Sequence, residues 1–167
     1  MKTSIRTAAG LPAVLLAGGV AVACAPAERP AGERESRPPA VEYLTSEATA
    51  SLGLPFSEAV RVGDLLFLSG HVGNLPGTFE LAPGGIQGET RQALENIRRV
   101  LEANGSSLKR VVRCDVFLAD ISEWGAMNEV YVEFFSPDHL PARSALGASG
   151  LAIGARVEIE CVATVEP

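Results

Sequence analysis

Ala155–Val165 carries apolar side chains at nearly every second position, which makes it the clearest strand in the chain. A period of two places the apolar side chains on one face of a sheet and the polar ones on the other. Such a half-buried strand needs neighbouring strands and a second layer over its apolar face. The chain is therefore expected to fold around a sheet with one covered face.

The covering layer is predicted to be helical. Apolar residues within 86–103 recur with the spacing of one buried helix face, and Asn104-Gly105 is typical of a left-handed C-terminal cap. A second helix is expected over about 123–135, after the capping residues Asp120 and Ser122. Its inner face is expected to hold Trp124, Met127, Tyr131, Phe134 and Phe135.

The remaining strands are short apolar runs bounded by glycine and proline. They are expected at 41–45, 59–62, 65–69, 111–118 and 142–148. Gly63-Asp64 between the second and third of these runs predicts a hairpin turn. The order of elements predicts an α+β domain with a two-layer architecture and both helices on one face of the sheet. The opposite face is expected to be covered by oligomerisation.

Residues 1–24 are predicted to be a secretory signal. Lys2 and Arg6 precede a small apolar stretch, and Ala21-Val22-Ala23-Cys24 resembles a lipobox, with Cys24 as the acylated residue. Ala21 and Ala23 also fit an ordinary secretory cleavage site, which remains the alternative. The apolar stretch is shorter than the roughly 20 residues of a spanning helix.

Residues 25–40 are rich in Pro, Glu and Arg, and are predicted to be a disordered tether. A single domain is expected over 41–167. The expected location is outside the cytoplasm, in the periplasm or envelope, with the N-terminal lipid as the only membrane contact.

Charge and cysteine content exclude several classes of function. Net charge is −6, and after residue 24 there are 12 basic and 20 acidic residues, which disfavours a nucleic-acid partner. Cys114 and Cys161 lie in apolar strands, and buried free thiols are favoured over a disulfide, which remains open for an exported protein. The chain has two histidines and no Cys-x-x-Cys pair, so no metal site is expected.

Six short stretches between residues 55 and 160 match the motifs of one known protein family, in the same order and with the same spacing. They are Pro55–Val60 (PFSEAV), Leu66–Gly70 (LFLSG), Glu89–Ile97 (ETRQALENI), Asn128–Tyr131 (NEVY), Pro141–Ser144 (PARS) and Val157–Glu160 (VEIE). Together they resemble the Rid (YjgF-type) family. The resemblance implies a chorismate-mutase-like fold and a homotrimer with ligand sites between subunits. It implies hydrolysis of enamines and imines, converting 2-imino acids to 2-keto acids and ammonia, without a cofactor or metal.

The resemblance also assigns roles to individual residues. Arg143 matches the arginine of the PARS stretch, and a guanidinium can clamp a substrate carboxylate with two parallel donors. Glu158 matches the family's acidic residue on the last strand and can hold or deprotonate the attacking water. Alternation places Glu160 on the same side of that strand, so spacing alone does not choose between the two. Ser69, Gly70 and Asn128 match substrate-contacting positions.

Three positions depart from the deaminase pattern. Phe56 stands where a tyrosine is usual and has no hydroxyl to donate. Ala145 replaces a frequent cysteine, although its backbone N–H can still bind a carboxylate. Residues 146–153 (LGASGLAI) replace a more polar stretch. These departures leave open a non-catalytic alternative, in which the domain is an envelope-anchored module that binds small metabolites or acts as a chaperone.

Overall fold

A computed structural model describes residues 38–166. The predicted signal, Cys24 and most of the predicted tether lie outside these residues. The helices are α1 (Glu47–Ala50), α2 (Gly85–Ala103) and α3 (Trp124–Tyr131), with short 3₁₀ turns at Leu108–Arg110, Ile121–Glu123 and Ala152–Gly154. The strands are β1 (Val41–Leu44), β2 (Ala59–Val62), β3 (Leu65–Leu68), β4 (His71–Val72), β5 (Val111–Leu118), β6 (Ala142–Gly147) and β7 (Val157–Thr164).

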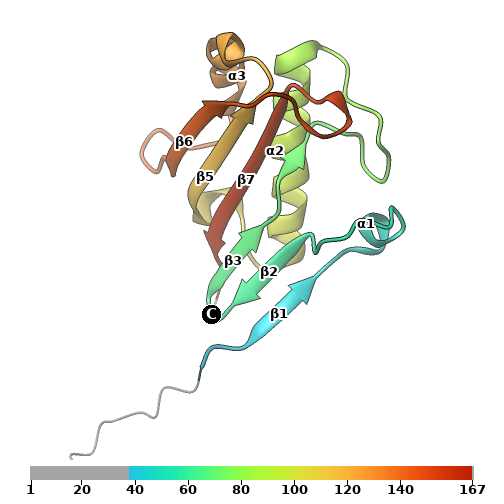
Figure 1. Cartoon of the computed structure of the whole chain (residues 1–167). Helices are drawn as coiled ribbons and strands as arrows, with labels where there is room; N and C mark the ends of the chain where they lie inside the picture. The colour runs from blue at the N-terminus through green and yellow to red at the C-terminus, as the bar shows by residue number, and fades with distance from the viewer. Residues whose placement is uncertain (1–37, 167) are drawn as a thin grey trace, which may run out of the picture. The chain divides into compact units, whose positions relative to one another are not determined.

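The strands form one seven-stranded mixed sheet in the order β1-β2-β3-β7-β5-β6, with β4 also paired to β7 (Figure 1). All neighbours are antiparallel except β5 and β6, which are parallel. β2 and β3 form the predicted hairpin, with Val62 opposite Leu65 and Gly63 at a φ of +58° in the turn. β7 is therefore the central strand, and it carries the alternating pattern seen in the sequence.

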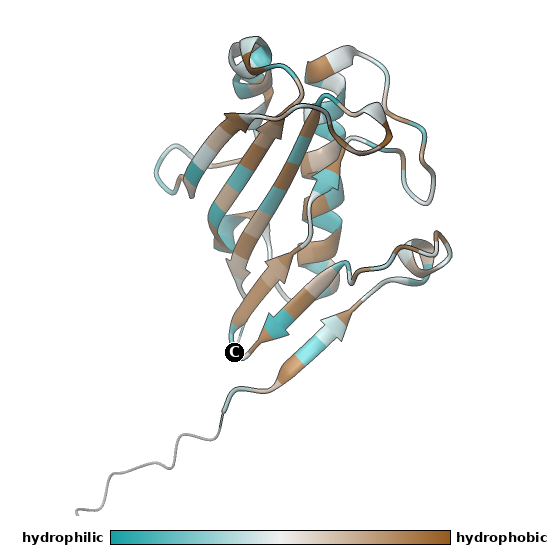
Figure 2. Cartoon of the chain, in the orientation of Figure 1, coloured by the Kyte–Doolittle hydropathy of each residue, from teal (hydrophilic) through white to brown (hydrophobic). Residues whose placement is uncertain are grey.

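Both main helices lie on one face of the sheet, as predicted, so the domain is α+β with two layers (Figure 1). Apolar side chains of β5 and β7 pack against α2, and hydrophobic and hydrophilic bands alternate along these strands (Figure 2). The core includes Leu66, Leu94, Ile97, Leu101, Val116, Leu118, Met127, Val157 and Ile159. We call the other side of the sheet, away from α2 and α3, the open face (Figure 1).

The second helix is shorter than predicted. It ends at Tyr131, and the amides of Glu133 and Phe134 then donate to carbonyls only three residues back, which is a tightened turn. Met127, Tyr131 and Phe135 are buried as expected, but Phe134 is only half-buried. Trp124 is 43% exposed, so its placement on the inner face was wrong. It begins the helix, and its ring lies beside Arg143.

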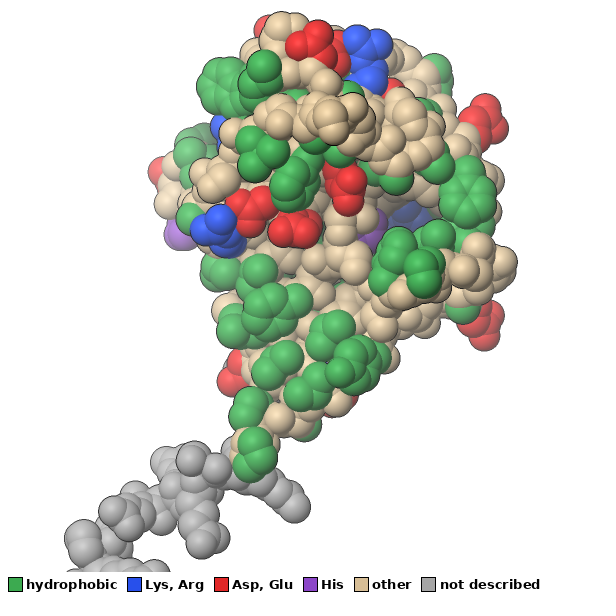
Figure 3. All heavy atoms as spheres, in the orientation of Figure 1, with side chains coloured by type: hydrophobic (Ala, Val, Ile, Leu, Met, Phe, Trp, Pro, Cys, Tyr) green, Lys and Arg blue, Asp and Glu red, His purple; other side chains and the backbone are tan. Residues whose placement is uncertain are grey.

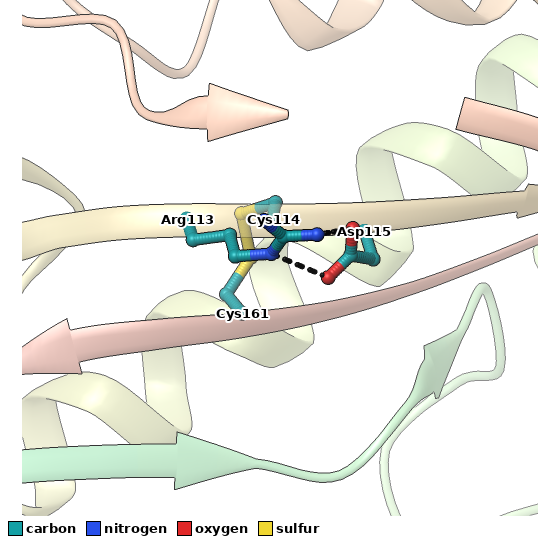
Figure 4. Close-up of a disulfide and its surroundings, with 4 residues drawn as sticks. All are labelled: Arg113, Cys114, Asp115 and Cys161. Atoms are coloured by element: carbon teal, nitrogen blue, oxygen red, sulfur yellow. Dashed lines mark hydrogen bonds and ion pairs between the residues drawn. A yellow bond between two sulfur atoms is a disulfide. The ribbon is translucent and has the colours of Figure 1, made fainter. Parts of the chain in front are cut away.

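Cys114 and Cys161 form a disulfide between β5 and β7 (Figure 4), so the favoured reading of two free thiols was wrong. The two residues are direct partners in the strand register, with a Cα–Cα distance of 4.1 Å. Both are buried on the helix side. On the open face the neighbouring Arg113 makes two hydrogen bonds to the Asp115 carboxylate, at 2.9 and 2.7 Å.

Removing this disulfide is expected to destabilise the domain strongly. The bridge joins residues 47 apart, and the chain-entropy model assigns such a loop about 4 kcal/mol of stability. Urea unfolding of the oxidised protein, the reduced protein and the Cys114→Ala/Cys161→Ala variant measures the effect. The reduced protein and the variant are expected to unfold at similar, lower urea concentrations. Coincident curves for oxidised and reduced protein would contradict the account.

Candidate functional site

A pocket of about 720 Å³ opens between α1, β4 and α2. Four residues predicted for the site line it: Phe56, Ser69, Gly70 and Glu158. They come from the loop before β2, from the end of β3 and from β7. We call these four residues the pocket half-site.

Gly70 allows the Glu158 carboxylate to lie against the backbone. A Cβ built on Gly70 would stand 1.9 Å from Oε1 of Glu158, so a larger residue at this position would displace the carboxylate. Glu158 is half-buried, and burial, helped by the nearby Glu160, raises its pKa. A carboxylate with a raised pKa is a stronger base than an ordinary one, which suits the abstraction of a proton from water.

Ser69 and Phe56 play more limited parts. The Ser69 hydroxyl donates a 2.7 Å hydrogen bond to the Ser57 carbonyl. Toward a ligand, the Ser69 hydroxyl oxygen can therefore act only as a hydrogen-bond acceptor. Its amide donates to the Glu58 carbonyl. Phe56 is 51% exposed at the pocket and offers a flat apolar wall to a ligand.

Arg143 lies in a different environment. Its guanidinium donates a 2.8 Å hydrogen bond to Oδ1 of Asn128 and lies 4.5 Å from the ring centroid of Tyr131 and 5.8 Å from that of Trp124. Ala145 is two residues further along the same strand. We call these five residues the arginine half-site. The aromatic rings and the amide fix the guanidinium by cation–π contact and hydrogen bonding.

Within the described residues, no carboxylate forms an ion pair with Arg143. A guanidinium has five N–H donors, and the hydrogen bond to Asn128 uses one of them. Donors therefore remain for two parallel hydrogen bonds to a ligand carboxylate.

One chain does not bring the two half-sites together. Arg143 is opposite Cys114 in the register of β6 and β5, and Cys114 points to the helix side. Glu158 is opposite Phe117 and alternates with the buried Val157 and Ile159, so it points to the open face. None of the arginine half-site lines the pocket. The Arg143 guanidinium and the Glu158 carboxylate therefore belong to different surfaces of the protein.

His71 and Glu58 were not singled out from the sequence, although both line the pocket. Nε2 of His71 is buried and has no hydrogen-bond partner among the described residues. Burial lowers the pKa of His71 to about 4, against an opposing effect of Glu58, so its imidazole is neutral near pH 7. Burial disfavours ionisation of Glu58, but hydrogen bonds from Ser46 and Thr49 outweigh it and lower its pKa.

Comparison with known proteins identifies the family. The family profile described as Endoribonuclease L-PSP matches residues 46–165, which is nearly all of the described domain. The chain belongs to this family, also known as RidA/YjgF. It is 42% identical over 123 residues to the mouse 2-iminobutanoate/2-iminopropanoate deaminase, an alignment that covers 74% of this chain and 90% of the mouse protein.

Other members of the RidA/YjgF family are similarly close. A RutC family protein of Pyrococcus horikoshii is 41% identical over 123 residues, covering 74% of this chain and 96% of its own length. The crystal structure of a Rid-family protein from Yersinia pestis superposes with a TM-score of 0.70 at 32% identity, covering 75% of this chain and all of the other. The predicted family and fold are thus confirmed.

In residues 38–166, no group of three or more His, Cys, Asp or Glu side chains is arranged to hold a metal ion. No helix of this region is long and apolar enough to cross a membrane.

Proposed function

We propose that this RidA/YjgF protein hydrolyses 2-imino acids to 2-keto acids and ammonia, in a site that two copies of the chain build together. The observation that carries the proposal is the presence of two separate half-sites on one chain. One holds a carboxylate with a raised pKa, and the other holds an arginine that has no ion-pair partner between residues 38 and 166. The mouse relative named 2-iminobutanoate/2-iminopropanoate deaminase supports the same chemistry.

The proposed reaction consumes one water and needs no redox partner. Arg143 binds the substrate carboxylate and orients the C=N carbon. Glu158 accepts a proton from water as the water oxygen bonds to that carbon, and this proton is passed to the imine nitrogen. In the resulting carbinolamine the hydroxyl proton moves to the amine nitrogen as the C–N bond breaks, so that ammonia leaves and C=O replaces C=N. Proton transfer by a positioned carboxylate contributes typically 10²–10⁴-fold to such a step.

A homotrimer is the proposed assembly. On the open face, apolar side chains gather over β1–β3 (Figure 3), where Val41, Tyr43, Leu65 and Phe67 are between 40% and 75% exposed. Exposed apolar patches of this kind mark interfaces. A second copy on this surface would bury it, and a closed ring of identical contacts would give every pocket half-site an arginine half-site from its neighbour.

The proposed activity is tested by coupling an amino-acid oxidase to the purified protein in the presence of catalase. Semicarbazide is added to compete with the protein for the imine. We expect keto acid to form faster with the protein than in buffer alone. Size-exclusion chromatography with light scattering is expected to give an oligomer. A monomer, or the uncatalysed rate of imine loss, would refute the proposal.

A non-catalytic binding module is the second candidate. Phe56 at the pocket, which has no hydroxyl, favours it. Thermal shift with 2-keto acids separates the two, because stabilisation without turnover indicates binding alone. An endoribonuclease, as named in the family description, is disfavoured by the net charge of −6 and by the carboxylates of Asp115, Glu158 and Glu160 on the open face.

We also propose that the protein is exported and anchored through Cys24. The lipobox-like Ala21–Cys24 stretch supports it. The Cys114–Cys161 disulfide adds independent support, because such bridges form and persist in oxidising compartments. Palmitate labelling of cells that express the full chain is expected to mark the unaltered protein and to leave Cys24→Ser unmarked. Equal absence of label in both would reject the anchor.

A further inference from the structure

The pocket extends well beyond the residues expected to act on the imine. Its far part is lined by apolar side chains from α1, from the loop that follows it, from the loop between β4 and α2, and from α2 itself. These are Ala48, Leu52, Leu54, Phe79, Val100 and Ala103. We call this part the apolar lobe. The segment of α2 from Asn96, beside β4, to Ala103 spans about 10 Å, which gives the lobe its length.

The pocket is larger than a three- or four-carbon acid requires. Its volume of about 720 Å³ lies in the range of roughly 300–1,000 Å³ that holds drug-sized ligands. On the open face, a hollow with histidine and basic side chains at its floor is visible beside α1 (Figure 3). His71 lines this pocket, and its Nε2 has no hydrogen-bond partner within residues 38–166, which leaves one polar atom there for a ligand to satisfy.

The charges around the pocket disfavour an acidic ligand side chain. Glu58 and Glu158 both line it, and hydrogen bonds from Ser46 and Thr49 hold Glu58 in its ionised form. The Arg99 guanidinium, which also lines the pocket, donates to Oδ1 of Asn96. Two carboxylates thus stand against one guanidinium around the pocket, and the lobe itself is lined by apolar side chains, so an uncharged, mainly apolar side chain fits these surroundings better than a second carboxylate.

We infer that the apolar lobe receives the substrate side chain, and that the substrates are 2-imino acids with large uncharged side chains, such as those derived from leucine or phenylalanine. This inference rests on the proposed function. With the imine carbon beside Glu158 and Gly70, the side chain extends between α1 and α2. Alanine-derived imine, with only a methyl group, leaves the lobe empty, and glutamate-derived imine places a charge in it.

The test uses the full chain and imines generated from alanine, leucine, phenylalanine and glutamate by suitable oxidases. Faster hydrolysis of the leucine and phenylalanine imines is expected. Ala48→Trp and Ala103→Trp fill the lobe from opposite walls at exposed positions, so the fold should tolerate them. Each is expected to slow the phenylalanine imine roughly tenfold and to spare the alanine imine. Ala50→Trp, on the same short helix as Ala48 but outside the pocket, is the control.

Each result has one meaning. Preference for the alanine imine, or equal effects of both lobe substitutions on small and large imines in folded protein, would overturn the inference and leave the proposed function intact. Acceleration of none of the four imines would instead reject the proposed function.

Discussion

Replacing Arg143 by alanine is expected to lower kcat/KM for 2-imino acids roughly a thousandfold, about 4 kcal/mol of transition-state stabilisation. Truncation leaves the substrate carboxylate without its clamp. Arg143→Lys keeps the charge but loses the planar pair of donors and the stacking on Tyr131, so about a hundredfold loss is expected. Steady-state rates of the three proteins with one imine measure both effects.

Arg91 provides the matched control. Like Arg143, it lies beside an aromatic ring, with Phe134 at 5.9 Å, but its guanidinium is paired with the Glu133 carboxylate at 2.8 Å. Arg91→Ala is expected to leave the rate unchanged. A folded and assembled Arg143→Ala protein that hydrolyses the imine as fast as Arg91→Ala would show that another residue binds the substrate carboxylate.

Glu158→Gln is expected to lower kcat by roughly a hundredfold or more, the usual contribution of a positioned general base. The amide keeps the shape of the side chain beside Gly70 but cannot accept the proton. Glu160→Gln is the matched control, since it alternates onto the same side of β7 but is exposed and does not line the pocket. Retained activity in Glu158→Gln together with loss in Glu160→Gln would reverse the assignment.

The pH profile provides a further check on Glu158. The active form of the base is the carboxylate, so the rate should fall as pH decreases through its raised pKa, at a higher pH than for an ordinary glutamate. Glu160→Gln removes a neighbouring negative charge that raises this pKa. The acidic limb of the profile should therefore move to lower pH in that variant, while the rate near pH 7 stays the same.

Local patterns in the sequence predicted the elements well. Apolar residues recur with a period of two in 155–165 and with helical spacing in 86–103. Each period indicates both the type of element and the face that is buried. The end of the helix predicted over 123–135 was placed too late, because its last turn tightens after Tyr131. The burial of its first residue was also predicted wrongly, because Trp124 packs beside Arg143. Contacts between distant segments decide such details.

The disulfide and the pocket depend on pairings that no local pattern states. Cys114 meets Cys161 only because β5 and β7 pair in one particular register, although 47 positions separate the two residues. His71 joins the pocket because a two-residue strand pairs with β7 between the strand expected at 65–69 and the helix expected at 86–103. The resemblance supplied Arg143 and Glu158, but only the strand register shows that they point to opposite faces.

This separation of Arg143 and Glu158 makes the account directly testable by mixing two inactive variants. Arg143→Ala retains the pocket half-site, and Glu158→Gln retains the arginine half-site. We assume that each site combines a pocket half-site from one copy with an arginine half-site from its neighbour. When the two variants are mixed in equal amounts and their subunits exchange at random, one contact in four then joins two intact half-sites. About one quarter of the unaltered activity should then return. Verified mixed assemblies that stay inactive would contradict a site shared between copies.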